Sequence, residues 1–286
     1  MSDELPRITA EAEDGAESAE GPGRLRQDVP HSARMYDYYL GGNTNYAVDR
    51  DAAQQVVRAF PAVRTAARVN RAFVHRSARL LARTHGIRQF LDIGTGIPTA
   101  PNLHEVVQRE APAARVTYVD NDPIVLVYAD SLLRSSAEGA TGYVEADVRD
   151  PEHLLDVVRR DGCLDLTQPV GLSLNALLHF VPDDMDAYGV VGGLVGALAP
   201  GSYLTISHCT PDFAPDVWAA IVEVYTKGGT PLQVRSRSEV RDFFTGLELL
   251  DPGVEVAHRW NPEPGSGPSL ISDADASLYV GVARKP

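Results

Sequence analysis

The chain has 286 residues, of which 44% are hydrophobic, and a formal net charge of −13. This length allows one large domain or two small ones with a full hydrophobic core, and no internal repeat is visible. The acidic balance argues against a nucleic-acid partner, because phosphate groups require a basic surface.

The N-terminal segment, residues 1–28, is acidic and poor in large apolar side chains, so we expect it to be disordered. It lacks the basic stretch and the apolar segment of a signal peptide. The longest apolar run, residues 188–200, is broken by glycines and is too short to span a bilayer. Cys163 and Cys209 lie far apart and outside any metal-ligand spacing, so both should be reduced thiols. These features predict a cytoplasmic protein.

Residues 29–64 contain the stretch "MYDYYLGGNTNY" (35–46), which is dense in tyrosine. Its apolar side chains recur at i,i+4 spacing, which predicts a short helix with one apolar face. Gly41 and Gly42 then allow a sharp turn and a close approach to a ligand. We expect this segment to form a helical lid, although its rings could equally be ordinary core residues with satisfied hydroxyls. The tyrosines proposed to roof a ligand are Tyr36, Tyr39 and Tyr46.

Residues 65–286 alternate between helical and strand-like apolar patterns, which is typical of a parallel sheet flanked by helices. Helices are predicted at 65–85, 100–111, 123–135, 151–161, within 184–199, at 215–227 and at 239–247. Strands are predicted at 88–94, 115–120, 142–148, 169–178, 202–209, 254–260 and 278–285. The last two strands have no helix between them, so they should pair antiparallel. The predicted fold is therefore α/β, a doubly wound and mostly parallel sheet of seven strands with a ligand at the carboxyl ends of its strands.

Helix starts in this segment carry recognisable capping signals. Asp122 and Asp150 each precede a proline, which is a preferred arrangement at the first turn of a helix. Ser236 and Glu239 have the spacing of a capping box.

The first predicted strand ends in "DIGTG" (92–96), a turn with two glycines. Gly94 and Gly96 permit a tight turn and a close approach of the backbone to a ligand. Asp92 lies inside the apolar strand, where a carboxylate is costly unless it meets a partner. Thr99 stands where a dinucleotide-binding fingerprint would have its third glycine. A pyrophosphate has no obvious need for Asp92, whereas a ligand with an ammonium group does.

Acidic residues also end the next two predicted strands. Asp120 is placed to accept hydrogen bonds from both hydroxyls of a ribose. The alternative is that it merely caps the following helix, but Asp122 already occupies the capping position. Asp147 ends the third strand and could accept from an adenine amino group. Each acid alone is more simply structural, but together with the glycine turn they predict a nucleoside site.

These motifs resemble those of class I S-adenosylmethionine-dependent methyltransferases. "DIGTG" resembles the first methyltransferase motif, "VDND" the ribose-binding acid, "ADV" the adenine-contacting motif and "SLNALLHFV" the motif after the fourth strand. More narrowly, "ARMYDYYLGGNTNYAVDR", "NRAFVHR" and "IRQFLDIGTGIPT" together resemble a bacterial S-adenosyl methyltransferase family formerly known as a domain of unknown function. This resemblance runs from about Pro30 to the C-terminus. It implies a Rossmann-like methyltransferase fold with S-adenosyl-L-methionine as the cofactor.

The resemblance also implies roles for individual residues. Asp92 and the glycine turn would hold the methionine end of the cofactor, Asp120 the ribose, and Asp147 the adenine. Arg71 could face a carboxylate of the ligand or be an exposed helix position. The full set of cofactor-binding candidates is Asp92, Gly94, Thr95, Gly96, Asp120, Asn121, Asp147, Val148, Asn175, Tyr36, Gly41, Gly42 and Arg71.

Catalysis of methyl transfer depends mainly on positioning, because the donor is already activated. A general base is needed only if the acceptor must lose a proton. His179 is the leading candidate base and Asn175 should lie near the sulfonium, although His179 could equally be a packed residue at the start of a helix. His208 is a second candidate that we expect to be structural, and no residue spacing predicts a metal site. Residues 259–269 are either an acceptor loop or a mobile connector.

The sequence therefore predicts methyl transfer from S-adenosylmethionine to a small-molecule acceptor, with no nucleic-acid or membrane partner. One alternative is an NAD-dependent oxidoreductase, against which Asp92 and Thr99 argue. Another is a non-catalytic module that binds S-adenosylmethionine, which the sequence leaves open.

Overall fold

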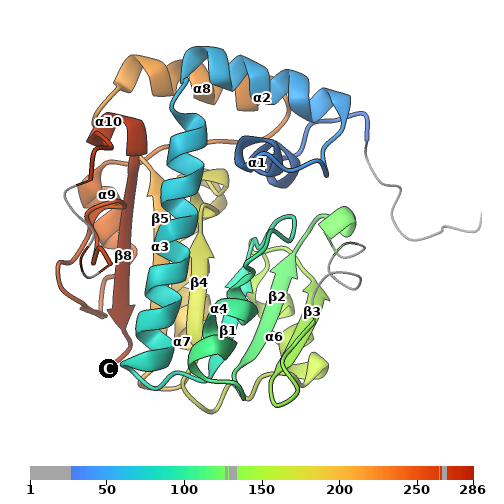
Figure 1. Ribbon diagram of the computed structural model, residues 1–286, viewed down its shortest axis with the longest axis vertical. Helices are drawn as coiled ribbons and strands as arrows, with labels where there is room; N and C mark the ends of the chain where they lie inside the picture. Colours follow the sequence, from blue (N-terminus) through green and yellow to red (C-terminus); the bar gives the residue numbers. More distant parts are fainter. Residues whose placement is uncertain (1–26, 126–127, 129–133, 264, 266–268) are drawn as a thin grey trace, which may run out of the picture.

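The structure is a computed structural model that describes residues 27–125, 128, 134–263, 265 and 269–286. The predicted tail, residues 1–28, falls almost entirely outside the described residues, as does most of the predicted helix 123–135. The remainder of the chain forms one mixed sheet with helices on both faces (Figure 1).

Within the described residues the sheet has eight strands. Seven of them follow the order β3-β2-β1-β4-β5-β8-β6, and the eighth, β7, also pairs with β8. The strands are β1 Gln89–Ile93, β2 Arg115–Asp120, β3 Ala140–Glu145, β4 Gly171–Asn175, β5 Tyr203–Cys209, β6 Glu248–Leu249, β7 Glu255–Val256 and β8 Leu278–Arg284. The first five strands are parallel, whereas β8 runs antiparallel to β5, β6 and β7. The predicted doubly wound, mostly parallel α/β fold is confirmed.

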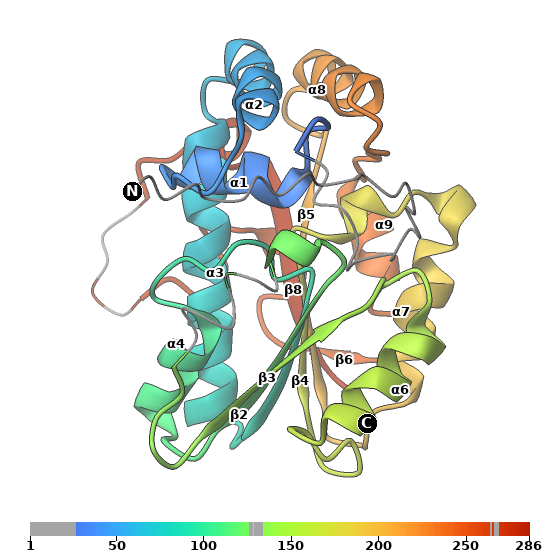
Figure 2. The same cartoon turned by 90° about the vertical axis from the view of Figure 1, so that its right-hand side faces the viewer.

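Helices cover the sheet in two layers, and a third group stands over one edge. Figure 2 shows α3 and α4 on one face and α6, α7 and α9 on the other. Helices α1, α2 and α8 lie above the carboxyl ends of the parallel strands. The bounds are α1 Ser32–Leu40, α2 Ala47–Ala59, α3 Val63–Arg83, α4 Leu103–Glu110, α6 Pro151–Asp161, η1 Leu178–Phe180, η2 Asp183–Met185, α7 Ala187–Gly196, α8 Pro215–Lys227, α9 Arg237–Asp242 and α10 Asp273–Ala276.

The residues predicted to cap helices do so at the first turns of α6 and α9. The Asp150 carboxylate accepts a hydrogen bond from the His153 N–H at the start of α6. Ser236 and Glu239 form the capping box of α9, which confirms both predictions. These caps satisfy backbone N–H groups that have no partner within the helix.

The C-terminal part of the sheet differs from the prediction of seven strands. The predicted strand 254–260 shrinks to β7, because the following backbone turns away from the sheet toward α3. There Arg76 donates hydrogen bonds to the carbonyls of Ala257 and Trp260, and Trp260 packs edge-on against Phe73. Helix α10 and strand β6 were not predicted, whereas the antiparallel pairing of β7 with β8 is confirmed.

Candidate active site

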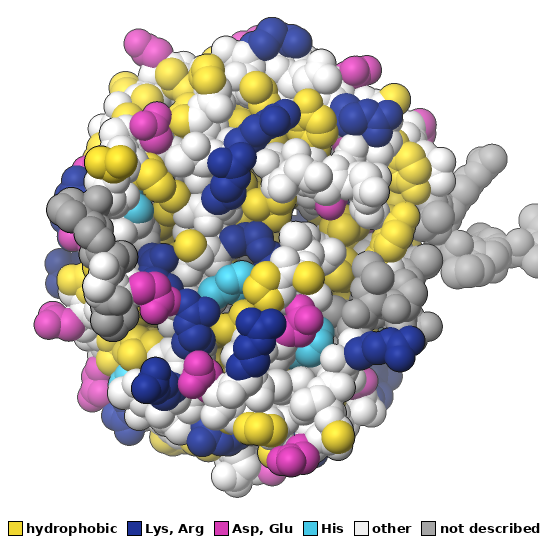
Figure 3. All heavy atoms as spheres, viewed as in Figure 1, with side chains coloured by type: hydrophobic (Ala, Val, Ile, Leu, Met, Phe, Trp, Pro, Cys, Tyr) yellow, Lys and Arg dark blue, Asp and Glu magenta, His cyan; other side chains and the backbone are white. Residues whose placement is uncertain are grey.

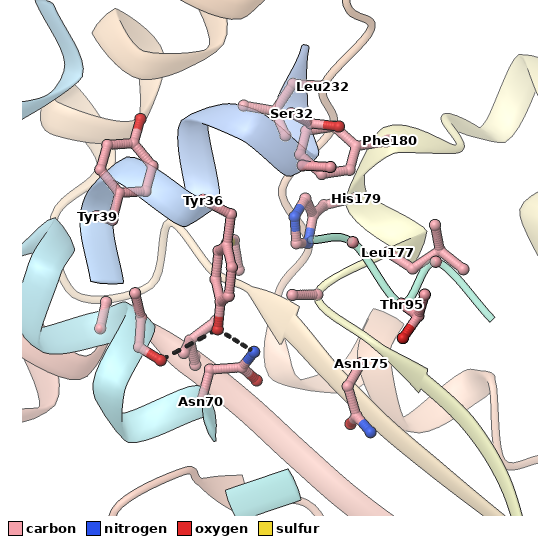
Figure 4. A pocket seen from close by; sticks show the side chains of 18 of the residues that line it. Ser32, Tyr36, Tyr39, Asn70, Thr95, Asn175, Leu177, His179, Phe180 and Leu232 are labelled. Atoms are coloured by element: carbon pink, nitrogen blue, oxygen red, sulfur yellow. Dashed lines mark hydrogen bonds between the residues drawn. The ribbon is translucent and has the colours of Figure 1, made fainter. Parts of the chain in front are cut away.

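A cleft opens at the carboxyl ends of β1, β2, β4 and β5, beneath α1, α2 and α8 (Figure 4). One part of its lining is polar and comes from the loops that follow the strands. The other part is apolar and comes mainly from the helices above them. The predicted site residues that line the cleft are Tyr36, Arg71, Asp92, Gly94, Thr95, Gly96, Asp120, Asn121, Val148, Asn175 and His179.

The glycine turn after β1 requires two positive φ angles, 71° at Gly94 and 67° at Gly96. The N–H groups of Gly94 and Thr95 donate to the carbonyl of Val119 and join the turn to β2. A Cβ atom at Gly94 would lie 2.6 Å from the Leu177 side chain. This turn is therefore held against the segment that follows β4.

Asp92 is part of β1, and its carboxylate accepts a hydrogen bond from the Thr95 hydroxyl at 2.9 Å. Burial raises the pKa of Asp92, while neighbouring hydroxyls and the positive charge of Arg71 act in the opposite direction. Arg71 donates to the carbonyls of Thr99 and Pro101 and holds the loop beyond the glycine turn. A carboxylate and a guanidinium therefore line the same cleft, which suits a ligand bearing both an ammonium and a carboxylate.

Asp120 joins the end of β2 to the glycine turn. Its carboxylate accepts from the Gly96 N–H at 2.8 Å and from the Asp122 N–H at 3.0 Å, and burial raises its pKa. Asp122 in turn accepts from the Ile124 N–H, as expected for a capping residue, and lies 3.2 Å from the His31 ring. Asp120 is thus free of the capping role and keeps its carboxylate at the cleft.

Asp147 is not among the residues that line the cleft, so its contact with an adenine stays a prediction. Its side chain forms an ion pair with Arg149 at 2.5 Å, which lowers the pKa of Asp147. It also accepts a long hydrogen bond from the Asn121 amide at 3.4 Å. The flanking residues Ala146 and Val148 line the cleft instead.

Asn175 ends β4 and lines the cleft. Its amide nitrogen donates to the hydroxyls of Ser173 at 2.7 Å and Thr205 at 3.2 Å. Its carbonyl oxygen is buried and makes no hydrogen bond within the protein. A buried acceptor without a partner costs free energy unless a ligand supplies a donor.

His179 lies in η1 and lines the cleft, and its Nδ1 atom makes no hydrogen bond within the protein. Burial lowers the pKa of His179 well below the ordinary value, and His208 and Arg235 act in the same direction. His208 lies outside the lining and contacts Arg235 through Nε2 at 2.8 Å and the Cys209 carbonyl through Nδ1. Burial lowers the pKa of His208 to about 3. His179 is therefore the neutral imidazole at the cleft, and His208 is placed as a structural residue.

Two tyrosines of the N-terminal segment reach the cleft. Tyr36 descends from α1 toward α3 in Figure 4, and its hydroxyl donates to the Ala67 carbonyl and accepts from the Asn70 amide. The Tyr39 hydroxyl lies 3.4 Å from the hydroxyl of Tyr225 on α8. Both rings line the cleft with their hydroxyls already partnered.

The remaining predicted residues of this segment lie outside the lining. Tyr46 packs against a small apolar cluster that includes Ile97. Gly41 ends α1 with a φ of 86°, and a Cβ atom at Gly42 would collide with the Asp37 carboxylate. The two glycines therefore serve the turn between α1 and α2, and neither lines the cleft.

The loop 259–269 does not line the cleft in its described part, so the interpretation as an acceptor loop receives no support. Arg259 forms an ion pair with Asp273 next to α10, and Glu263 forms one with Arg79 on α3. Residues 264 and 266–268 lie outside the described part of the chain.

Sequence reasoning missed the rings that complete the lining: Phe60, Phe180, Trp218 and Tyr225. The spacing of Trp218, Ile221 and Tyr225 does show that α8 has one apolar face. Such a face covers a core as readily as a cavity, so the pattern alone could not assign it to a ligand site.

Arg235 was also missed, and it fixes the backbone that carries His179. Its buried guanidinium donates to the carbonyls of Leu178 and Val181 and to the Asp183 carboxylate at 2.6 Å. No local pattern separates this arginine from the many exposed ones in the chain.

No group of three side chains able to hold a metal ion occurs among the residues that the structure describes. Across those same residues, no helix has the length and apolar character needed to cross a bilayer. Figure 3 shows acidic and basic side chains interspersed on the face that it views.

Comparison with known proteins places this geometry among methyltransferases. Residues 18–286 match the family model described as S-adenosyl methyltransferase. A solved structure of a DUF574 family protein from Streptomyces avermitilis is 46% identical, with a TM-score of 0.88 and coverage of 92% of this chain and 100% of that one. A proposed methyltransferase from Thermobifida fusca is 36% identical, with a TM-score of 0.83 and coverage of 94% and 99%. No curated protein matches the chain.

Proposed function

The chain belongs to the S-adenosyl methyltransferase family and is a methyltransferase with S-adenosylmethionine as methyl donor, and we propose that its methyl acceptor is a small molecule. The observation that carries this proposal is the continuity of the cleft. It runs from the polar loops after β1 and β2 into an apolar part covered by α1, α2 and α8. An acceptor that reaches the donor within this space must fit beneath three helices.

The polar part of the cleft fits the methyl donor. Asp92 offers a carboxylate to the ammonium of the methionine part, and the turn at Gly94 and Gly96 allows the backbone to approach it. Asp120 accepts from the ribose hydroxyls, since each of its oxygens keeps a second lone pair. Val148, which lines the cleft, contacts the adenine, and the neighbouring Asp147 stays a candidate acceptor for the adenine amino group.

S-adenosylmethionine, when bound, supplies a methyl group on a positively charged sulfur. The protein then has to orient the acceptor and exclude water. His179 is the candidate base where the acceptor must lose a proton, because its imidazole is neutral and its Nδ1 is unpartnered. Burial lowers the pKa of His179 and so weakens it as a base. Asn175 offers its unpartnered carbonyl oxygen next to the same loops.

Helices α1 and α2 act as a lid over both ligands in this proposal. A buried ion pair between Arg34 of α1 and Asp49 of α2 joins the two helices at 3.0 Å. His31, which precedes α1, contacts Asp122 after β2 and so links the lid to the ribose end of the site. A cytoplasmic location stays a prediction, consistent with free thiols at Cys163 and Cys209.

Two measurements on the purified protein test the proposal. Calorimetric titration should show binding of S-adenosylmethionine and S-adenosylhomocysteine and no binding of NAD. Labelled methyl transfer into the small-molecule fraction of a metabolite extract should then appear, and Asp120→Asn should weaken donor binding in parallel with turnover. Donor binding without methylation of any small molecule, or methylation confined to macromolecules, would refute the proposed acceptor class.

A further inference from the structure

We propose that the methyl acceptor is an uncharged aromatic molecule carrying a hydroxyl or carbonyl oxygen, bound beside His179 and Trp218. This inference rests on the proposed function, because it takes the polar part of the cleft as the place of the donor. We call the remaining part the aromatic chamber. It is lined by Tyr39, Phe60, His179, Phe180, Trp218, Ile221 and Tyr225, and it shares Tyr36, which lies near Arg71, with the donor part.

Among the residues that the structure describes, none that lines the aromatic chamber offers a counter-charge to an ionic acceptor. The charged residues Arg71, Asp92 and Asp120 belong to the donor part of the cleft. Among the described residues, the remaining titratable groups of the cleft wall near the chamber include Cys209, whose thiol pKa burial raises to about 12, and His179, which is neutral. An ion entering this space would lose its hydration without compensation.

The walls of the chamber are rings that pack against one another. Phe60 lies 5.9 Å from Trp218, and Phe180 lies 5.6 Å from Tyr225, measured between ring centroids. Tyr36 and Phe180 flank the view into the pocket in Figure 4. Aromatic side chains bind flat rings by edge-to-face and offset contacts, which favours an aromatic acceptor over a flexible aliphatic one.

Two buried polar atoms of the chamber have no partner in the protein. Trp218 and His179 are each 5% exposed, yet the Trp218 Nε1 and the His179 Nδ1 make no hydrogen bond. The indole N–H can only donate, so it requires an acceptor atom on the ligand. The imidazole nitrogen can accept or donate, according to its tautomer.

The tyrosine hydroxyls of the chamber all have a partner in the protein. Tyr36 is bonded to Ala67 and Asn70, and Tyr39 and Tyr225 share one hydrogen bond, which uses one of their two O–H protons. The atoms of the chamber with no partner at all are therefore those of Trp218 and His179. An aromatic ligand with an oxygen substituent offers an acceptor to the indole N–H, and a hydroxyl also offers a donor to the imidazole nitrogen.

The charge requirement is tested with three probes of equal ring size: naphthol, naphthalenesulfonate and naphthylmethylammonium, each substituted at the same ring position. Their affinities are measured calorimetrically in the presence of saturating S-adenosylhomocysteine. We expect naphthol to bind more than about tenfold tighter than either ion, because the ions lose hydration. Equal or tighter binding of an ion would overturn the proposal.

The location is tested with the two tryptophans of the chain. Trp218→Phe keeps an aromatic ring, although a smaller one, but removes the N–H, and should weaken naphthol binding roughly fivefold. Trp260→Phe is the matched control, because Trp260 is also buried with an unpartnered Nε1 but does not line the cleft. It should leave naphthol binding unchanged. In the Trp260→Phe variant Trp218 is the one remaining tryptophan, and the fluorescence of Trp218 should change when naphthol binds.

The outcomes separate this inference from the proposed function. Binding of S-adenosylhomocysteine without any preference for naphthol sinks the inference and leaves the methyltransferase proposal standing. Loss of naphthol affinity to the same degree in Trp218→Phe and Trp260→Phe also sinks it, since the effect would then be general destabilisation. Failure to bind S-adenosylhomocysteine would instead count against the proposed donor site.

Discussion

At the scale of single residues, two opposed effects act on the Asp92 carboxylate: burial disfavours its ionised form, and an ammonium group of the donor favours it. Burial raises the pKa of Asp92, so its ionised form is costly in the empty cleft. An ammonium group of the donor relieves that cost. We predict that Asp92→Asn weakens S-adenosylmethionine binding about 10- to 100-fold, because a hydrogen bond between charged groups is lost. Calorimetric titration checks this.

The same residue predicts a pH dependence. The ionised carboxylate is the form that binds ammonium, so donor affinity is full above the raised pKa and falls as the pH drops through it. The fall should begin at a higher pH than for an ordinary aspartate. Asp92→Asn should reduce this dependence to the part that Asp120 contributes, and a wild-type affinity that stays flat through the acid range would contradict the role.

Residue roles were predictable where the local motif alone fixes the side chain. Asp92 and Asp120 were found because a strand end and a glycine turn place them at the cleft. Asp147 follows β3 by two residues, and Arg149 two residues later forms an ion pair with it. Competition between a ligand site and a nearby arginine depends on side-chain rotamers, which the spacing of residues does not determine.

At the scale of elements, α1 should act as part of the donor site. Tyr36→Ala removes a ring that lines the cleft, and we predict a roughly tenfold rise in the dissociation constant of S-adenosylmethionine. Tyr38→Ala is the control, because Tyr38 lies outside the lining, with Arg64 over its ring. If the folded Tyr36→Ala and Tyr38→Ala variants bind S-adenosylmethionine equally well, α1 does not act as a lid over the donor.

The η1 segment depends on a single buried arginine. We predict that Arg235→Met lowers the free energy of unfolding by roughly 3 kcal/mol or more, because two carbonyls and the Asp183 carboxylate lose their donor. Arg237→Met, which removes a half-exposed guanidinium near Glu255, should cost about 1 kcal/mol or less. Urea denaturation distinguishes the two. Similar losses would mean that Arg235 does not fix η1.

Elements were predictable in proportion to their length. The strands β1 to β5 and β8 and the helices that flank them follow apolar periodicity over five or more residues. β6 and β7 contain two residues each, and their positions are set by pairing with β8. Long-range contacts of this kind, including those of Arg76 with the backbone after β7, leave no periodic trace in the sequence.

At the scale of the whole molecule, ligand binding should stabilise the fold. The cleft lies between the sheet and the helices above it, so unfolding either one destroys the site. At about 100 times its dissociation constant, S-adenosylhomocysteine adds about 2.7 kcal/mol, which corresponds to a rise in Tm of roughly 4–5 °C for a chain of this size. Differential scanning fluorimetry measures this, with NAD as the negative control.

The side chain of Leu177 fills the space left by the absent Cβ of Gly94, and it also lines the cleft only two residues before His179. In the proposed function, the Leu177 side chain therefore contacts both the methyl donor and the acceptor. Filling either position restricts how Leu177 can rearrange for the other, so we expect the two binding events to be cooperative. By thermodynamic reciprocity, the factor by which the bound donor changes the affinity for the acceptor equals the factor by which the bound acceptor changes the affinity for the donor.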